Sequence, residues 1–112
     1  MQTAVEKVGD VTIVALHEEA LDAANADAFR RAVAPALKDC RKLVLDLDRV
    51  QFMDSRGCGA ILSCLKHLSK EGGDLKLCRV TEPVQMVFEL IRMDQICQIV
   101  NTREEAVQAF QA

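Results

Sequence analysis

Ser55 is the side chain in this sequence with the clearest capacity for chemistry, because it stands where a strand-like run gives way to a helical one. Residues 43–47 are apolar except for Asp46 and are typical of a buried strand, and apolar residues then recur at helical spacing between residues 58 and 68. Asp54 and Ser55 at the junction are both favoured N-cap types. We therefore expect the Ser55 hydroxyl at a helix N-terminus, where it could serve as a nucleophile, as a phosphate acceptor or only as a helix cap.

A catalytic role for Ser55 requires a base within hydrogen-bond reach and a group that orients this base. His67 follows on the same predicted helix at a distance of about 18 Å, and His17 cannot be placed from the sequence. Met53 also occupies the position where the Gly-x-Ser-x-Gly elbow of hydrolases has its first glycine. The sequence therefore disfavours an enzyme that uses Ser55, although this reading stays open as an alternative.

Phosphorylation of Ser55 makes weaker demands than catalysis. It requires an exposed hydroxyl, a loop that a kinase can enter and an interface that responds to a charge of about −1.5 to −2. The backbone amides and the dipole of the first helical turn would tolerate a phosphate, whereas Asp54 would oppose it. Ser55 could meet all three requirements, but the residues alone favour a helix cap, because capping is the commonest use of Asp and Ser at such a junction.

The run from Val50 to Gly59, VQFMDSRGCG, closely resembles the signature of STAS domains, the sulphate transporter and anti-sigma factor antagonist family. It is most similar to the bacterial anti-anti-sigma factors, in which an apolar pair precedes Asp-Ser, one further residue, Gly, an apolar residue and Gly. The resemblance implies that Ser55 takes the place of the phosphorylated serine and that Asp22 matches an aspartate in the loop that faces the partner. The partner-binding residues that it implies are Asp22, Asp54, Ser55, Arg56, Gly57 and Gly59.

The function that this resemblance implies is that of an anti-sigma factor antagonist. The unphosphorylated protein would bind an anti-sigma factor, a serine kinase of the histidine-kinase-like ATPase type, and so free a sigma factor. This partner would then phosphorylate Ser55 with ATP and be released, and a phosphatase would be a further partner if the switch is reset. No catalytic residue, metal or cofactor is expected in the protein itself.

The motif departs from the family pattern at two positions. Arg56 stands where a second Ser or Thr is common, and Cys58 replaces the usual Leu. Arg56 could pair with a phosphate on Ser55, meet an acidic group of a partner, or remain a solvated surface residue. A rival reading is accordingly a STAS adaptor that is never phosphorylated, in a lipid-transport or stress-signalling complex, with Ser55 as a cap only.

The elements that must position this motif alternate along the chain. Strands are predicted over residues 4–8, 11–16, 43–47, 75–80 and 96–100, and helices over stretches that begin near Asp22, Ser55, Pro83 and Thr102. Gly9-Asp10 predicts a hairpin turn, and Asp22 is the expected cap of the first helix. The sequence thus predicts one α/β domain over residues 1–112, with a mostly parallel sheet of about five strands, an N-terminal hairpin and about four helices.

Two glycines lie inside the predicted helix that follows Ser55. Gly57 and Gly59 would each cost about 1 kcal/mol of helix stability relative to alanine. We expect close backbone approach, to the neighbouring strand or to a partner, to explain them.

Composition excludes several other classes of function. The net charge of −3 and the lack of Trp and Tyr disfavour nucleic-acid binding. No apolar run approaches the length of a membrane span, and Glu6 and Lys7 interrupt any signal peptide, which predicts a cytoplasmic protein. The five cysteines form no Cys-x-x-Cys pair, and Cys64 and His67 lack further ligands at a suitable spacing for a metal.

Overall fold

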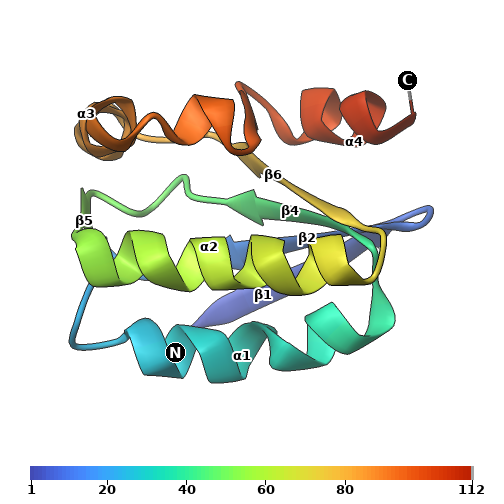
Figure 1. The fold of residues 1–112 in the computed structure, drawn as a ribbon, viewed down its shortest axis with the longest axis horizontal. Helices are drawn as coiled ribbons and strands as arrows, with labels where there is room; N and C mark the ends of the chain where they lie inside the picture. The colour runs from blue at the N-terminus through green and yellow to red at the C-terminus, as the bar shows by residue number, and fades with distance from the viewer. Residues whose placement is uncertain (112) are drawn as a thin grey trace.

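A five-stranded sheet forms the centre of the computed structural model, which describes residues 1–111. In the order β1-β2-β4-β6-β7, the strands span Thr3–Val8, Val11–Leu16, Lys42–Asp46, Asp74–Cys78 and Gln98–Val100 (Figure 1). Only β1 and β2 pair antiparallel, and their turn places Gly9 at a φ of 62°, which glycine adopts without a Cβ penalty. The predicted α/β class, with a mostly parallel sheet and an N-terminal hairpin, is confirmed.

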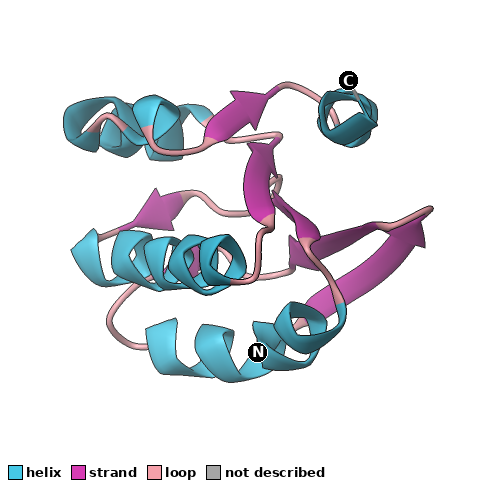
Figure 2. Ribbon diagram, turned by 45° about the vertical axis from the view of Figure 1, so that its right-hand side comes forward, coloured by secondary structure: helices cyan, strands magenta, loops and turns pink. Residues whose placement is uncertain are grey.

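The helices cover both faces of this sheet. They span Ala26–Asp39 (α1), Ser55–Lys70 (α2), Glu82–Ile91 (α3) and Arg103–Gln111 (α4). Helices α1, α2 and α3 contribute Phe29, Ile61 and Phe88 to a large core on one face. Helix α4 packs Ala106 and Val107 against the opposite face, and Figure 2 shows it across the sheet from α1 and α2. The central strands are therefore covered on both sides.

Strand β2 illustrates why these strands are continuous apolar runs. Because successive side chains point to opposite faces, Val14 and Leu16 lie in the large core, whereas Val11 and Ile13 lie in the core beneath α4. All of its residues are buried. A strand that is buried on both faces needs an apolar residue at nearly every position, which is the pattern that predicted it.

A short second pair of strands, which the sequence did not predict, lies beside the main sheet. Ala20–Leu21 (β3) and Phe52–Met53 (β5) pair in parallel. The backbone N–H groups of Gln51 and Phe52 also donate to the carbonyl oxygen of Glu19, at 2.7 and 3.1 Å. This pair aligns the segment before α1 with the segment before α2.

The predicted role of Asp22 as the cap of α1 is wrong. The helix begins at Ala26 with Asn25 at the N-cap position, so Asp22 lies a turn earlier. Its side chain accepts a hydrogen bond from the N–H of Ala24 at 3.0 Å, and its carbonyl oxygen accepts from the N–H of Ala26 at 2.8 Å. The reason is that Leu21 is held in β3, so the chain needs residues 22–25 to turn before the helix starts.

Two further boundaries differ slightly from the prediction, and one cap agrees with it. Strand β6 ends at Cys78, because Arg79 has a φ of 53° and leaves the extended conformation. Ile96 follows a short 3-10 helix, Met93–Gln95 (η1), so β7 starts only at Gln98. The predicted cap of the last helix is confirmed, since the Thr102 hydroxyl accepts from the N–H of Glu105 at 3.0 Å.

Candidate functional site

The junction between β5 and α2 presents Ser55 on the first turn of a long helix. Asp54 is the N-cap of α2, and its Oδ1 accepts a hydrogen bond from the N–H of Gly57 at 3.0 Å. Ser55 is the first helical residue, and both Ser55 and Arg56 are exposed. The expected position at a helix N-terminus is confirmed, and the capping side chain is that of Asp54.

The second carboxylate oxygen of Asp54 reaches the loop that precedes α1. Asp54 Oδ2 accepts from the N–H of Ala23 at 3.0 Å, so one side chain joins two segments that are far apart in the sequence. Hydrogen bonds from backbone amides, that of Gly57 first and then that of Ala23, outweigh desolvation and hold the pKa of Asp54 below its ordinary value. Asp54 therefore stays ionised at neutral pH and is a weak base for the neighbouring hydroxyl.

Asn25 shapes the loop that carries Asp22. Its amide nitrogen Nδ2 donates to the carbonyl oxygen of Ala20 at 2.8 Å, and its Oδ1 accepts from the N–H of Asp22 at 2.9 Å. Together with Asp54, these bonds bring the Asp22 loop next to the start of α2. The sequence analysis missed Asn25, although asparagine is common in turns because its side chain hydrogen-bonds to nearby backbone groups.

The two glycines of α2 have different surroundings. A Cβ on Gly57 would overlap the carbonyl oxygen of Leu21 in β3, which confirms the expected close approach to a neighbouring strand. Apart from its chain neighbours and the backbone of its own helix, a Cβ on Gly59 would meet no atom of residues 1–111 within 4 Å. Packing within the described residues thus explains Gly57 and leaves Gly59 unexplained.

The two histidines line cavities that do not include Ser55. His67 is exposed in the last turn of α2 and lines a cavity with Leu37 and Lys38. His17 lines a small polar cavity of about 180 Å³ with Asp46 and other charged residues. The structure therefore brings Asp54 to Ser55 but brings neither histidine into the junction. Among residues 1–111, no group of three or more His, Cys, Asp or Glu side chains is arranged to hold a metal ion.

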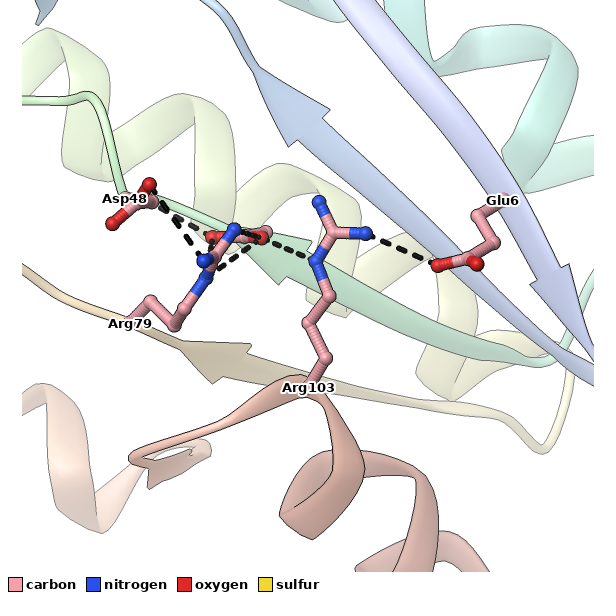
Figure 3. A network of polar contacts seen from close by, with 5 residues as sticks. Glu6, Asp48, Arg79 and Arg103 are labelled. Carbon is pink, nitrogen blue, oxygen red and sulfur yellow. Dashed lines mark hydrogen bonds and ion pairs between the residues drawn. The ribbon is translucent and has the colours of Figure 1, made fainter.

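A second polar cluster centres on Asp46, whose side chain is 0% exposed at the end of β4. Figure 3 labels the other members of this cluster, Glu6, Asp48, Arg79 and Arg103. Arg79 Nη2 donates to the Asp46 carboxylate at 2.6 Å, and Arg103 Nε donates to the same oxygen. Arg103 also pairs with Glu6 at 3.1 Å, and Arg79 with Asp48 at 3.7 Å. Burial acts to raise the pKa of Asp46, but the hydrogen bonds from Arg79 and Arg103 outweigh it and hold the pKa low.

The sequence predicted a strand over residues 43–47, and it did not predict this cluster around Asp46. A signal was present, because an aspartate next to a buried apolar run requires a charged or hydrogen-bonding partner. Its partners could not be read, since Arg79 and Arg103 lie 33 and 57 residues away. The cluster ties β4, β6, α4 and β1 together.

Comparison with known proteins identifies the family of this fold and motif. A family model described as STAS domain matches residues 2–106. The chain belongs to the STAS domain family. BtrV of Bordetella bronchiseptica is 32% identical over 98% of this chain and 95% of its own length. The anti-sigma F factor antagonist of Paenibacillus polymyxa is 32% identical over 96% of this chain and 92% of its own.

The crystal structure of TM1081 from Thermotoga maritima has the same STAS fold. It superimposes with a TM-score of 0.88 at 32% identity, over 98% of this chain and 95% of that one. Proteins named as anti-sigma factor antagonists are thus among the relatives that this STAS domain resembles over nearly its full length. Within residues 1–111, no helix has the length and apolar character that crossing a membrane requires.

Proposed function

We propose that this STAS domain binds an anti-sigma factor of the histidine-kinase-like serine kinase type, and that phosphorylation of Ser55 by this partner ends the binding. Binding of the unphosphorylated form would release a sigma factor. The single observation that carries the proposal is an exposed Ser55 on the first turn of α2, directly after a cap that another side chain provides.

The position of the cap favours a switch over a purely structural serine. Asp54 already accepts the hydrogen bond from Gly57 that an N-cap normally receives. The Ser55 hydroxyl is therefore not needed to begin the helix, and its exposure leaves it open to a kinase. These features support the assignment of Ser55 as the phosphate acceptor.

The electrostatics of the junction support a large effect of one phosphate. Asp54 is ionised and is held by backbone amides, so no side-chain cation cancels its charge within the cap. A phosphate adds a charge of about −1.5 to −2 next to it. A partner surface that covered both groups would have to desolvate them together, and a loss of about 2.7 kcal/mol already weakens binding roughly 100-fold.

The proposed contact residues divide into two groups. Asp22, Arg56 and Gly59 are exposed or half-buried around Ser55 and would contact the partner. Asp54 and Gly57 would act indirectly, because Asp54 fixes the loop of Asp22, and Gly57 allows α2 to approach β3. We therefore assign the first group to binding and the second to positioning.

Incubation with ATP and the histidine-kinase-like anti-sigma factor of the same organism tests the proposal. We expect intact-mass spectrometry to detect one added phosphate and peptide mapping to locate it at Ser55, with none added to Ser55→Ala. Affinity for the anti-sigma factor should fall roughly 100-fold in Ser55→Asp. Ser69→Asp is the matched control, because it adds the same charge to an exposed serine in the last turn of α2 and should leave affinity unchanged.

Other outcomes would contradict the switch in distinct ways. If the anti-sigma factor binds and Ser55→Asp binds equally well without any phosphate transfer, the protein is an adaptor of constant affinity. If phosphate is found on a different residue, the assignment of Ser55 is wrong.

A further inference from the structure

An apolar groove opens beside Ser55, between α2 and the segment formed by α3 and η1. Its volume is about 350 Å³. The residues that line it are Ser55, Cys58, Gly59, Leu62, Val87, Leu90, Ile91 and Ile96. Except for Ser55 and Gly59, every lining side chain is apolar, so the groove offers almost no hydrogen-bonding group.

The wall of this groove that α3 and Ile96 form consists of apolar side chains that are largely exposed. Leu90 is 85% exposed, Ile96 47% and Ile91 41%, although Val84 and Phe88 of the same helix are buried in the core. Burying a leucine side chain is worth about 1.5–3 kcal/mol. A cluster of exposed apolar side chains around a groove is typical of a binding surface.

Gly59 forms part of the opposite wall of the groove. Apart from its chain neighbours and the backbone of its own helix, a Cβ at this position would meet nothing within 4 Å among residues 1–111, so the space beside it is open. Glycine inside a helix costs about 1 kcal/mol relative to alanine. Access to the groove supplies a reason for a glycine that internal packing does not explain.

We propose that this groove receives apolar side chains of the anti-sigma factor, which bury Leu90 and Ile96 when the complex forms. The inference rests on the proposed function and extends it from Ser55 to a second, apolar part of the same interface. Continuity favours this occupant over others, because Ser55 itself lines the groove. Whatever fills the groove must therefore approach the hydroxyl that is proposed to carry the phosphate.

The groove also explains how a phosphate would act on binding. Charge at its edge would have to lose water when apolar side chains of the partner close over it. Phosphorylation would thus oppose the apolar contact as well as any direct polar contact of Ser55.

Affinity measurements with the unphosphorylated protein and the purified anti-sigma factor test this inference. We expect Leu90→Gln to weaken binding about tenfold or more, as the loss of a central apolar anchor does. Gly59→Leu, which fills the groove from within, should weaken it at least as much. Met86→Gln is the matched control, because Met86 is 62% exposed on the same helix and does not line the groove, and it should change affinity less than about twofold.

The possible results separate the groove from the switch. Wild-type binding with Leu90→Gln and Gly59→Leu both within about twofold would overturn the groove and leave the proposed function intact. Equal losses in Leu90→Gln and Met86→Gln would also overturn it, because the effect would not be specific to the groove. Absence of wild-type binding would remove the proposed function and the groove together.

A second copy of this chain is the competing occupant. Sedimentation equilibrium of the wild type and Leu90→Gln without the anti-sigma factor tests it. A wild-type dimer that Leu90→Gln converts to a monomer, with unchanged affinity for the anti-sigma factor, would overturn the inference. A monomer in both cases supports it.

Discussion

Two aspartates, Asp46 and Asp54, stand directly at or after the end of a strand, and both have a lowered pKa, yet they are held by different kinds of donor. Asp46 is buried and receives charged donors from Arg79 and Arg103. Asp54 is half-buried and receives neutral backbone donors from Gly57 and Ala23. Both carboxylates are ionised, but two arginines balance the charge of Asp46, whereas the charge of Asp54 is held by backbone amides alone.

This difference distinguishes the Asp46 cluster, which holds elements of the fold together, from the Asp54 junction, which is suited to respond to an added charge. In the Asp46 cluster, the buried carboxylate is balanced by two arginines from other parts of the chain, so its loss would remove an ion pair from each of them. At the Asp54 junction, backbone donors fix the geometry without cancelling the charge, and the adjacent Ser55 is exposed. An added phosphate would change the field there while the hydrogen bonds that build the junction remain.

Asp46→Asn should produce the largest loss of stability. It leaves two guanidinium groups without their shared carboxylate, and we expect the free energy of unfolding to fall by about 2–3 kcal/mol, below the full cost of a fully buried pair because both arginines are partly exposed. Urea denaturation at neutral pH measures it. Asp48→Asn is the control, because this exposed pair at 3.7 Å should contribute less than about 1 kcal/mol. Equal losses in both variants would contradict the assigned difference.

Gly57 and Gly59 of α2 provide a second contrast, between a crowded and an open position of one helix. Gly57→Ala should lower the free energy of unfolding by about 1–3 kcal/mol, because the new methyl group overlaps the carbonyl oxygen of Leu21. Gly59→Ala should raise it by up to about 1 kcal/mol, because the space is open and alanine favours the helix. Thermal unfolding of the two variants measures both changes. A loss of stability in Gly59→Ala would show that its surroundings are more crowded than the structure describes.

The stability that Asp46 provides should depend on pH. Its pKa in the folded protein lies below the unfolded value, so its contribution is present above the unfolded pKa of about 4 and is lost as the pH falls through the lower folded pKa. The difference in unfolding free energy between wild type and Asp46→Asn should therefore shrink between pH 7 and about pH 3. Urea titrations at both pH values measure it. A constant difference would mean that the ionised carboxylate is not the source.

The junction itself could be predicted from local signals, and its surroundings could not. Helix α2 begins at Ser55 as expected, because the apolar stripe and the strong cap that predict it both lie within the segment or directly before it. The close approach at Gly57 was inferred from the cost of a helical glycine alone. Its partner, the carbonyl oxygen of Leu21, comes from a strand of two residues that exists only through tertiary pairing.

The wrong cap at Asp22 and the unpredicted cluster around Asp46 both depend on contacts with distant segments of the chain. Asp22 has the residue type of a cap, but pairing of Leu21 with Met53 moves the helix start to Ala26. The convergence of Arg79 and Arg103 on one carboxylate depends on how β6 and α4 are placed. The exposure of Leu90, by contrast, follows from its spacing, because Leu90 lies off the helical stripe that contains Val84 and Phe88.

Ser55→Ala should have the smallest effect on the fold, and it tests the comparison most directly. Because Asp54 provides the cap and Ser55 is exposed, we expect the free energy of unfolding to stay within about 0.5 kcal/mol of wild type. Urea denaturation measures it, with Ser63→Ala as the control, an exposed serine of α2 whose hydroxyl donates to the carbonyl oxygen of Gly59. A loss above about 1 kcal/mol in Ser55→Ala alone would mean that its hydroxyl helps to build the junction. A residue that the fold does not need can carry a phosphate without unfolding the helix that presents it. Asp46 and its arginines differ in this respect, because a change there would destabilise the fold.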